Sequence, residues 1–211
     1  MATSKRAKRS ATIVAIAIAL LGVAAVPLVV AAGGSGGRAG PRAAEFRSEG
    51  AFSLLRPGPP PAGWQQTTTA TSRATLFYPP GWKRIPGDVG TVTSALKGEH
   101  GLYVGYLNAT PRQGAEQLHG WAAFRIDHNR EEGDKRVREV AAAEGLRFTN
   151  ARGSCVVDDY LSKIGSNPYR EIACLVSGPS RADVLIAAGR KQNWPALSGT
   201  LERAVSAFIQ R

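Results

Sequence analysis

Apolar residues follow three different patterns along the chain, and each pattern predicts a different kind of segment. Residues 11–32 form an unbroken apolar run without any charge, and the ten residues before it carry four bases. Residues 33–63 are rich in Gly and Pro and show no sustained apolar period, which is typical of a linker. From Trp64 onward, short apolar runs alternate with turn residues, as in a folded domain. The pattern therefore divides the chain into a basic tail (1–10), an apolar segment (11–32), a linker (33–63) and a domain (64–211).

The apolar segment is long enough to cross a membrane. Its 22 residues would extend ~33 Å as a helix, and the hydrocarbon core of a bilayer is ~30 Å thick. Apolar regions of secretory signals usually have only ~7 to 15 residues, which favours an uncleaved anchor, although residues 30–32 also fit a cleavage site before Gly33. The bases in residues 1–10 favour a cytoplasmic N-terminus. We therefore expect a single-pass protein of the cell membrane with domain 64–211 outside the cytoplasm; the alternative is secretion after cleavage.

Within the domain, alternating apolar runs predict β-strands joined mostly by short turns. Short connections imply an antiparallel sheet. The expected strands cover residues 74–78, 91–96, 102–107, 135–142, 154–162, 169–177 and 182–189.

Two stretches with apolar residues at helical spacing predict helices. Thr110 resembles an N-cap, with Pro111 at the first helical position and Gln113 completing a capping box, and Gly133 would end this helix. Pro195 would open a second helix near the C-terminus. The expected fold class is α+β, with a mostly antiparallel sheet flanked by two amphipathic helices and preceded by one N-terminal transmembrane helix. The expected apolar faces are Ala115, Leu118, Trp121, Ala122 and Phe124 in the first helix, and Leu197, Leu201, Ala204, Val205 and Phe208 in the second.

Three features point to a known fold: the segment YPPGWKRI (78–85), the order of the elements and the closing helix LERAVSAFI (201–209). With them, residues 64–211 resemble the PsbP/Mog1-like α/β/α sandwich of exported or membrane-anchored actinobacterial proteins. The resemblance implies a role in binding or assembly rather than catalysis, and it implies no particular site residues.

The two cysteines predict a disulfide. Cys155 and Cys174 lie in neighbouring strands separated by the turn-rich stretch KIGSNP, and a hairpin closing there would bring them nearly opposite each other. Two buried free thiols are the alternative, because cysteine is common in protein cores. The export signal favours the disulfide, which also supports the extracytoplasmic placement.

The net charge of +11 does not predict a nucleic-acid partner. Residues 1–64 contribute +6 of it and residues 65–211 contribute +5. In the domain, arginines are interspersed with acids such as Glu131 and Glu132, without the basic run that tracks a phosphate backbone. The expected partners are instead the membrane, through residues 11–32, and an envelope protein or small ligand.

No group of residues in the sequence has the spacing of a catalytic or metal site. The string GGSGG (33–37) lacks the flanking strand and helix of a nucleophile elbow. His119 and His128 are expected on opposite faces of one helix, and His128 is expected to pair with Glu132 at i, i+4. We therefore predict no catalytic residue, no metal and no cofactor.

Two further pairs of residues have side chains of the kinds that form catalytic or ligand-binding sites. Asp158 and Asp159 are adjacent in a strand, so they should point to opposite faces and cannot form a catalytic pair. Trp82 and Trp194 each neighbour a turn or a helix start, where aromatic side chains often line a cleft, and they are the candidate ligand-binding residues. The predicted function is a non-catalytic, membrane-anchored extracytoplasmic binding domain; the alternatives are an exported hydrolase with an unrecognised site and a structural subunit of an envelope assembly.

Overall fold

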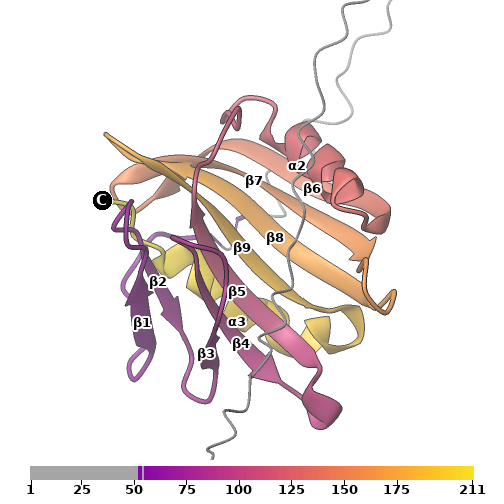
Figure 1. Cartoon of the computed structure of the whole chain (residues 1–211). Coiled ribbons are helices and arrows are strands. Elements are labelled where there is room, and N and C mark those ends of the chain that lie inside the picture. Colours follow the sequence, from indigo (N-terminus) through magenta and orange to yellow (C-terminus); the bar gives the residue numbers. More distant parts are fainter. Residues whose placement is uncertain (1–51, 54) are drawn as a thin grey trace, which may run out of the picture. The chain divides into compact units, whose positions relative to one another are not determined.

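The computed structural model describes residues 52, 53 and 55–211, which form one antiparallel sheet with helices on its two faces (Figure 1). The large sheet comprises β3 (Lys83–Ile85), β4 (Val92–Lys97), β5 (Tyr103–Pro111), β6 (Lys135–Phe148), β7 (Ala151–Leu161), β8 (Pro168–Ser177) and β9 (Ala182–Arg190). Its spatial order is β3-β4-β5-β9-β8-β7-β6. A separate hairpin pairs β1 (Gln65–Thr68) with β2 (Thr75–Tyr78). The helices are α2 (Trp121–Glu131), α3 (Trp194–Ala207) and the short 3-10 turns η2 (Glu99–Gly101) and η3 (Lys191–Asn193).

The two long helices cover different halves of opposite sheet faces. Helix α2 packs on β6, β7 and β8, whereas α3 packs on β9, β5, β8 and β2. Figure 1 shows α3 behind the sheet and α2 in front of it. The predicted α+β class with a mostly antiparallel sheet and two helices is therefore confirmed.

The central strands are buried on both faces because helices or loops pack on each side. Cys155, Cys174 and Leu185 lie side by side on β7, β8 and β9 and belong to the core on the α3 side. Their neighbours Val156, Ala173 and Ile186 form the next row and belong to the core under α2. Because successive residues of a strand point to opposite faces, a shift of one residue would exchange the two rows. The continuous apolar runs of these strands reflect this two-sided burial.

The predicted disulfide is confirmed. Cys155 and Cys174 are bonded and are directly paired between β7 and β8, with their Cα atoms 4.1 Å apart. Both residues are buried on the α3 side of the sheet. The hairpin read from the sequence therefore gave the correct register.

The predicted start of the first helix was wrong. Residues expected to cap and open that helix instead continue β5, where Thr110 pairs with Val184 and Pro111 pairs with Asp183 of β9. Pro111 has no N–H to donate and is tolerated because it lies at the strand end. Helix α2 starts only after Gly120, which has a φ of 77°. The closing helix begins with Pro195 in its first turn, as predicted.

Both edges of the sheet differ from regular strands. The edge strand β6 shows three register irregularities in its pairing with β7, and the other edge strand, β3, has only three residues. Bulges and short edge strands discourage pairing with other chains. Each edge therefore has a feature that protects it from aggregation.

The segment before β1 packs on the domain. Phe52 is buried in the core on the α3 side, and Leu55 packs against it. The backbone N–H of Arg56 donates a hydrogen bond to Ser206 Oγ at 3.2 Å. The expected membrane segment 11–32 lies outside the described residues, and none of the helices in the described part of the chain is long and apolar enough to cross a membrane.

Candidate functional site

Two adjacent aspartates on β7 mark the two polar sites of the sheet. Asp158 pairs with Glu171 of β8, and Asp159 pairs with Arg170 of the same strand. Because adjacent residues alternate in direction, Asp158 faces α2 and Asp159 faces the opposite side. The two carboxyl groups therefore lie on opposite faces of the sheet, as predicted, and have different partners there.

Under α2, a buried ion pair connects the helix to the sheet. Arg125 Nε lies 2.8 Å from Glu171 Oε1, and the side chain of Glu171 is 0% exposed. Asn129 Nδ2 donates a longer hydrogen bond of 3.4 Å to the same oxygen. The negative charge of Glu171 raises the pKa of Arg125 above its ordinary value, although burial alone would lower it. The guanidinium is therefore charged at all accessible pH values.

Asp158 lies beside this ion pair without a partner of its own. Among the described residues, neither of its two buried carboxyl oxygens has a hydrogen-bond partner, and the same is true of Glu171 Oε2. Burial, and after it the negative charge of Glu171, raise the pKa of Asp158 to about 9. Asp158 is thus a neutral carboxylic acid at pH 7.

Three tyrosines border the same cluster. The hydroxyl groups of Tyr106 and Tyr160 are 3.0 Å apart, and Tyr169 donates a hydrogen bond of 2.7 Å to the carbonyl of Tyr103. Burial raises the pKa of both Tyr106 and Tyr160 above the ordinary tyrosine value. These phenols are therefore protonated and suited to hydrogen bonding, and none of them is an activated nucleophile.

On the opposite face, three bases surround Asp159. Arg170 donates from Nε and Nη2 at 2.7 and 3.0 Å, Lys191 Nζ lies at 2.8 Å, and Arg138 Nη2 lies at 2.9 Å. Burial raises the pKa of Asp159, but the hydrogen bonds from Arg170 and Lys191 outweigh this effect and bring it down to about 2. Asp159 is therefore an anion across the physiological range.

A row of polar side chains lies on the part of the sheet that α2 does not reach. We call Thr91, Thr93, Asn108 and Thr110 the polar strip. Thr110 Oγ1 donates to Asn108 Oδ1 at 3.0 Å, and Asn108 Nδ2 donates to Thr93 Oγ1 at 2.8 Å. The hydroxyl groups of Thr91 and Thr110 are also 3.0 Å apart. These bonds fix the orientation of three hydroxyls and one amide; Thr93 is buried, and the other three residues are partly exposed.

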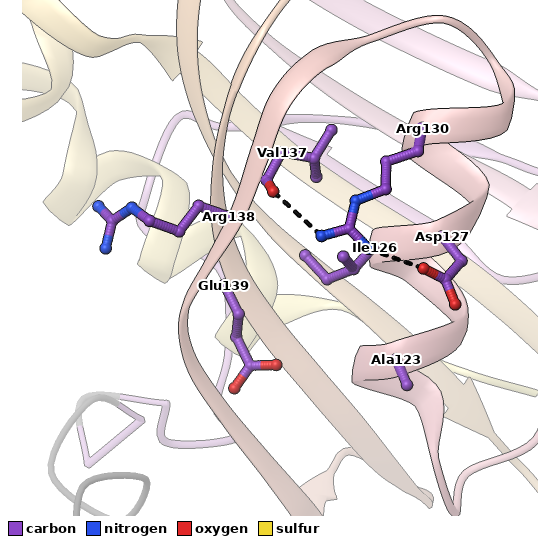
Figure 2. A pocket seen from close by; sticks show the side chains of 7 residues that line it. All are labelled: Ala123, Ile126, Asp127, Arg130, Val137, Arg138 and Glu139. Atoms are coloured by element: carbon purple, nitrogen blue, oxygen red, sulfur yellow. Dashed lines mark hydrogen bonds and ion pairs between the residues drawn. The ribbon is translucent and has the colours of Figure 1, made fainter.

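A shallow groove of about 430 Å³ lies between α2 and the edge strand β6 (Figure 2). Arg130 crosses it, bonded to Asp127 Oδ1 at 2.8 Å and to the carbonyl of Val137 at 3.4 Å. Figure 2 shows the Arg138 side chain pointing away from this groove. The lining residues are Ala123, Ile126, Asp127, Arg130, Val137, Arg138 and Glu139.

Comparisons with known proteins identify the fold. No family model matches the chain, and no curated protein is similar to it. The solution structure of cyanobacterial PsbP (CyanoP) from Synechocystis matches with a TM-score of 0.52 and 13% identity, covering 71% of this chain and 94% of that one. The chain has a PsbP-like fold. The resemblance based on the YPPGW segment and the element order is thereby confirmed for the fold.

Two further solved structures match the PsbP-like domain with lower scores. A Pseudomonas aeruginosa protein of unknown function has a TM-score of 0.47 and 9% identity, covering 70% of this chain and 97% of that one. LpqN, involved in cell envelope biogenesis of Mycobacterium tuberculosis, has a TM-score of 0.44 and 10% identity, covering 69% of this chain and 89% of that one.

The two tryptophans proposed as ligand-binding residues occupy different positions in the PsbP-like domain. Trp82 is 4% exposed and belongs to the core on the α3 side. Trp194 is partly buried against the same core, and the guanidinium of Arg170 lies 5.7 Å from the centre of its ring. Neither lines the groove of Figure 2. A ligand site shared by both residues stays a prediction.

The described histidines pair with acids near the surface. His119 Nδ1 lies 3.2 Å from Glu144, and His128 Nε2 lies 3.2 Å from Glu132, the i, i+4 pair expected from the sequence. The hydrogen bond that His128 donates to the Glu132 carboxylate raises the pKa of His128. In the part of the chain that the structure describes, no group of three His, Cys, Asp or Glu residues could hold a metal ion.

The sequence did not point to the cluster under α2. The register that pairs Cys155 with Cys174 also pairs Asp158 with Glu171, but the contacts of Arg125 and Asn129 with Glu171 form only when α2 packs on these strands. One signal was present, because Arg125 and Asn129 interrupt the apolar face of the helix four residues apart. Polar residues at this spacing on a buried helix face require buried partners.

Proposed function

We propose that this chain is a non-catalytic binding domain held outside the cytoplasm by residues 11–32. The observation that carries the proposal is the polar strip, in which the partly exposed Thr91, Asn108 and Thr110 present oriented hydroxyl and amide groups beside the part of the sheet that α2 covers. Such fixed donors and acceptors suit recognition of a polar partner surface or ligand. The length of the apolar segment and the disulfide support the anchored, extracytoplasmic placement.

The positions of the ionisable groups support binding rather than catalysis. Asp158 and Asp159 are the acids with the most strongly altered pKa values, and both are buried. Asp158 is enclosed under α2, and Asp159 is bonded to three bases. Among the described residues, neither His119 nor His128 is hydrogen-bonded to a serine or tyrosine hydroxyl. The exported-hydrolase alternative therefore has less support.

The alternative of a structural envelope subunit also has less support. Such a subunit should present a large contiguous apolar patch. The large apolar side chains that the described part of the chain exposes are Val89, Leu102, Val140 and Ile164, and they lie on four separate segments.

Site-specific crosslinking on the full chain tests the proposal. The two native cysteines are bonded to each other, so an introduced cysteine is the one free thiol for a photoreactive maleimide. We expect Thr91→Cys in the polar strip to give a discrete adduct with components of native membranes. Ile164→Cys, 85% exposed and in the turn between β7 and β8, is the control and should give none.

Two results would contradict the proposal. One is equal labelling from Thr91→Cys and Ile164→Cys, which would mean that the strip has no specific partner. The other is turnover of an ester, peptide or glycoside by the purified chain that a single substitution abolishes.

A further inference from the structure

The cluster around Asp159 carries more positive charge than its carboxylate can neutralise. Arg138 from β6, Arg170 from β8 and Lys191 from η3 all contact this one acid. Three bases and one carboxylate leave a local excess of two positive charges. Because the bases come from three separate elements, the fold itself concentrates this charge at one place.

The excess charge is accessible from solvent. The Asp159 side chain is 8% exposed and already accepts hydrogen bonds from four N–H groups. Because a carboxylate has about four acceptor sites, Asp159 cannot accept further hydrogen bonds from these bases. Arg138 and Lys191 are 66% and 49% exposed, and among the described residues neither has another acceptor. Arg170 is 25% exposed and is held against the ring of Trp194. The remaining N–H groups of these three bases are therefore available to an acceptor from outside the domain.

We infer that Arg138, Arg170 and Lys191, with Trp194 beside them, form a binding site for the carboxylate side chains of an acidic segment of a partner protein. The arginines present planar donor groups that match carboxylates, and Asp159 acts as a positioning residue that holds the cations together. The site is a compact cluster and lacks the line of bases that a nucleic-acid backbone requires. It lies on the opposite face from the polar strip, so it extends the proposed function to a second surface.

Peptide binding to the full chain tests this inference. The ligand is a fluorescent peptide with four glutamates, and a peptide with glutamines in their place is the control. We expect Arg138→Gln/Lys191→Gln to weaken binding of the glutamate peptide about tenfold, because two exposed ion pairs are lost. Lys83→Gln/Arg84→Gln, on the opposite edge strand β3, removes the same charge from exposed positions and should change binding less than about twofold.

A second readout does not depend on the variants. In the wild-type chain, the glutamate peptide should shift the indole N–H resonance of Trp194, assigned with Trp194→Phe, and leave that of the core residue Trp82 unchanged. The inference is overturned if both double variants weaken binding equally or if the glutamine peptide binds as well. Thr91→Cys crosslinking in Arg138→Gln/Lys191→Gln separates the two proposals, because it should persist if only this site fails.

Discussion

Asp158 and Asp159 are neighbours on one strand, yet their carboxyl groups have opposite properties. The pKa of Asp158 is raised to about 9 by burial and by the charge of Glu171. The pKa of Asp159 is about 2, because hydrogen bonds from Arg170 and Lys191 outweigh the effect of burial. Identical side chains one residue apart thus carry no charge on one sheet face and a full charge on the other.

The hydrogen-bond donors available on each face decide the charge state of the carboxyl group there. The face under α2 supplies the guanidinium of Arg125, which is already paired with Glu171. The other face supplies three bases to a single carboxylate. A buried acid with donors stays ionised, and a buried acid without them takes up a proton.

The two sites also contribute to stability in opposite pH ranges. Asp158 has a raised pKa in the folded state, so its contribution is full below pH ~4 and is lost as the pH rises towards about 9. Asp159 has a lowered pKa, so its contribution is full above pH ~4 and is lost as the pH falls towards about 2.

The largest expected effect comes from removing the one cation under α2. Arg125→Met should lower the free energy of unfolding by about 3–5 kcal/mol at pH 7, because Glu171 would remain buried without its partner. Chemical denaturation followed by circular dichroism measures this change.

A double variant separates the lost pair from the lost side-chain packing. Arg125→Met/Glu171→Gln also removes the buried negative charge, so it should recover more than half of the lost stability. If the double variant is as unstable as Arg125→Met, the ion pair is not the cause and the comparison of the two faces fails.

Removing the anion on the other face should have a smaller effect. Asp159→Asn should lower the free energy of unfolding by about 2 kcal/mol at pH 7, because it loses charge-assisted hydrogen bonds while the exposed bases remain hydrated. Urea denaturation at pH 7 and pH 2.5 checks this. The deficit should shrink at pH 2.5, and a constant deficit would mean that the charge of Asp159 is not what stabilises the fold.

The sequence was sufficient for the features that depend on local pattern. The strand register that pairs Cys155 with Cys174, the α+β class and the closing helix from Pro195 follow from alternation, turn residues and helical spacing. The start of the first helix was mispredicted because Thr110 and Pro111 fit a local capping pattern, whereas pairing with β9 keeps them in a strand. Non-local pairing outweighed local propensity at this position.

The polar sites were harder to predict because their members are distant in sequence. The alternation of Asp158 and Asp159 was predictable from strand geometry. Which of them would be neutral was not, since that depends on Arg125 of α2 and on Lys191 of η3, which approach β7 only in the folded domain.

Neutralising the acid under α2 should increase stability. Asp158→Asn should raise the free energy of unfolding by about 1–2 kcal/mol at pH 8, because the wild-type chain must take up a proton on folding and an amide need not. The advantage of the variant should shrink as the pH falls towards 4, where the wild-type chain takes up less than one proton on folding. Thermal unfolding across this pH range measures the difference, and a gain that does not vary with pH would contradict the assigned proton on Asp158.

The smallest expected effect concerns a single base on the Asp159 face. Lys191→Gln should lower the free energy of unfolding by only about 0.5 kcal/mol, because Lys191 is 49% exposed and Asp159 keeps both arginines. Thermal unfolding in low and high salt checks this, with Lys83→Gln as the exposed control without such a partner. A loss as large as that of Asp159→Asn would make Lys191 the main source of the low Asp159 pKa. A small loss instead leaves Lys191 largely free to contact a partner, which the proposed acidic-peptide site requires.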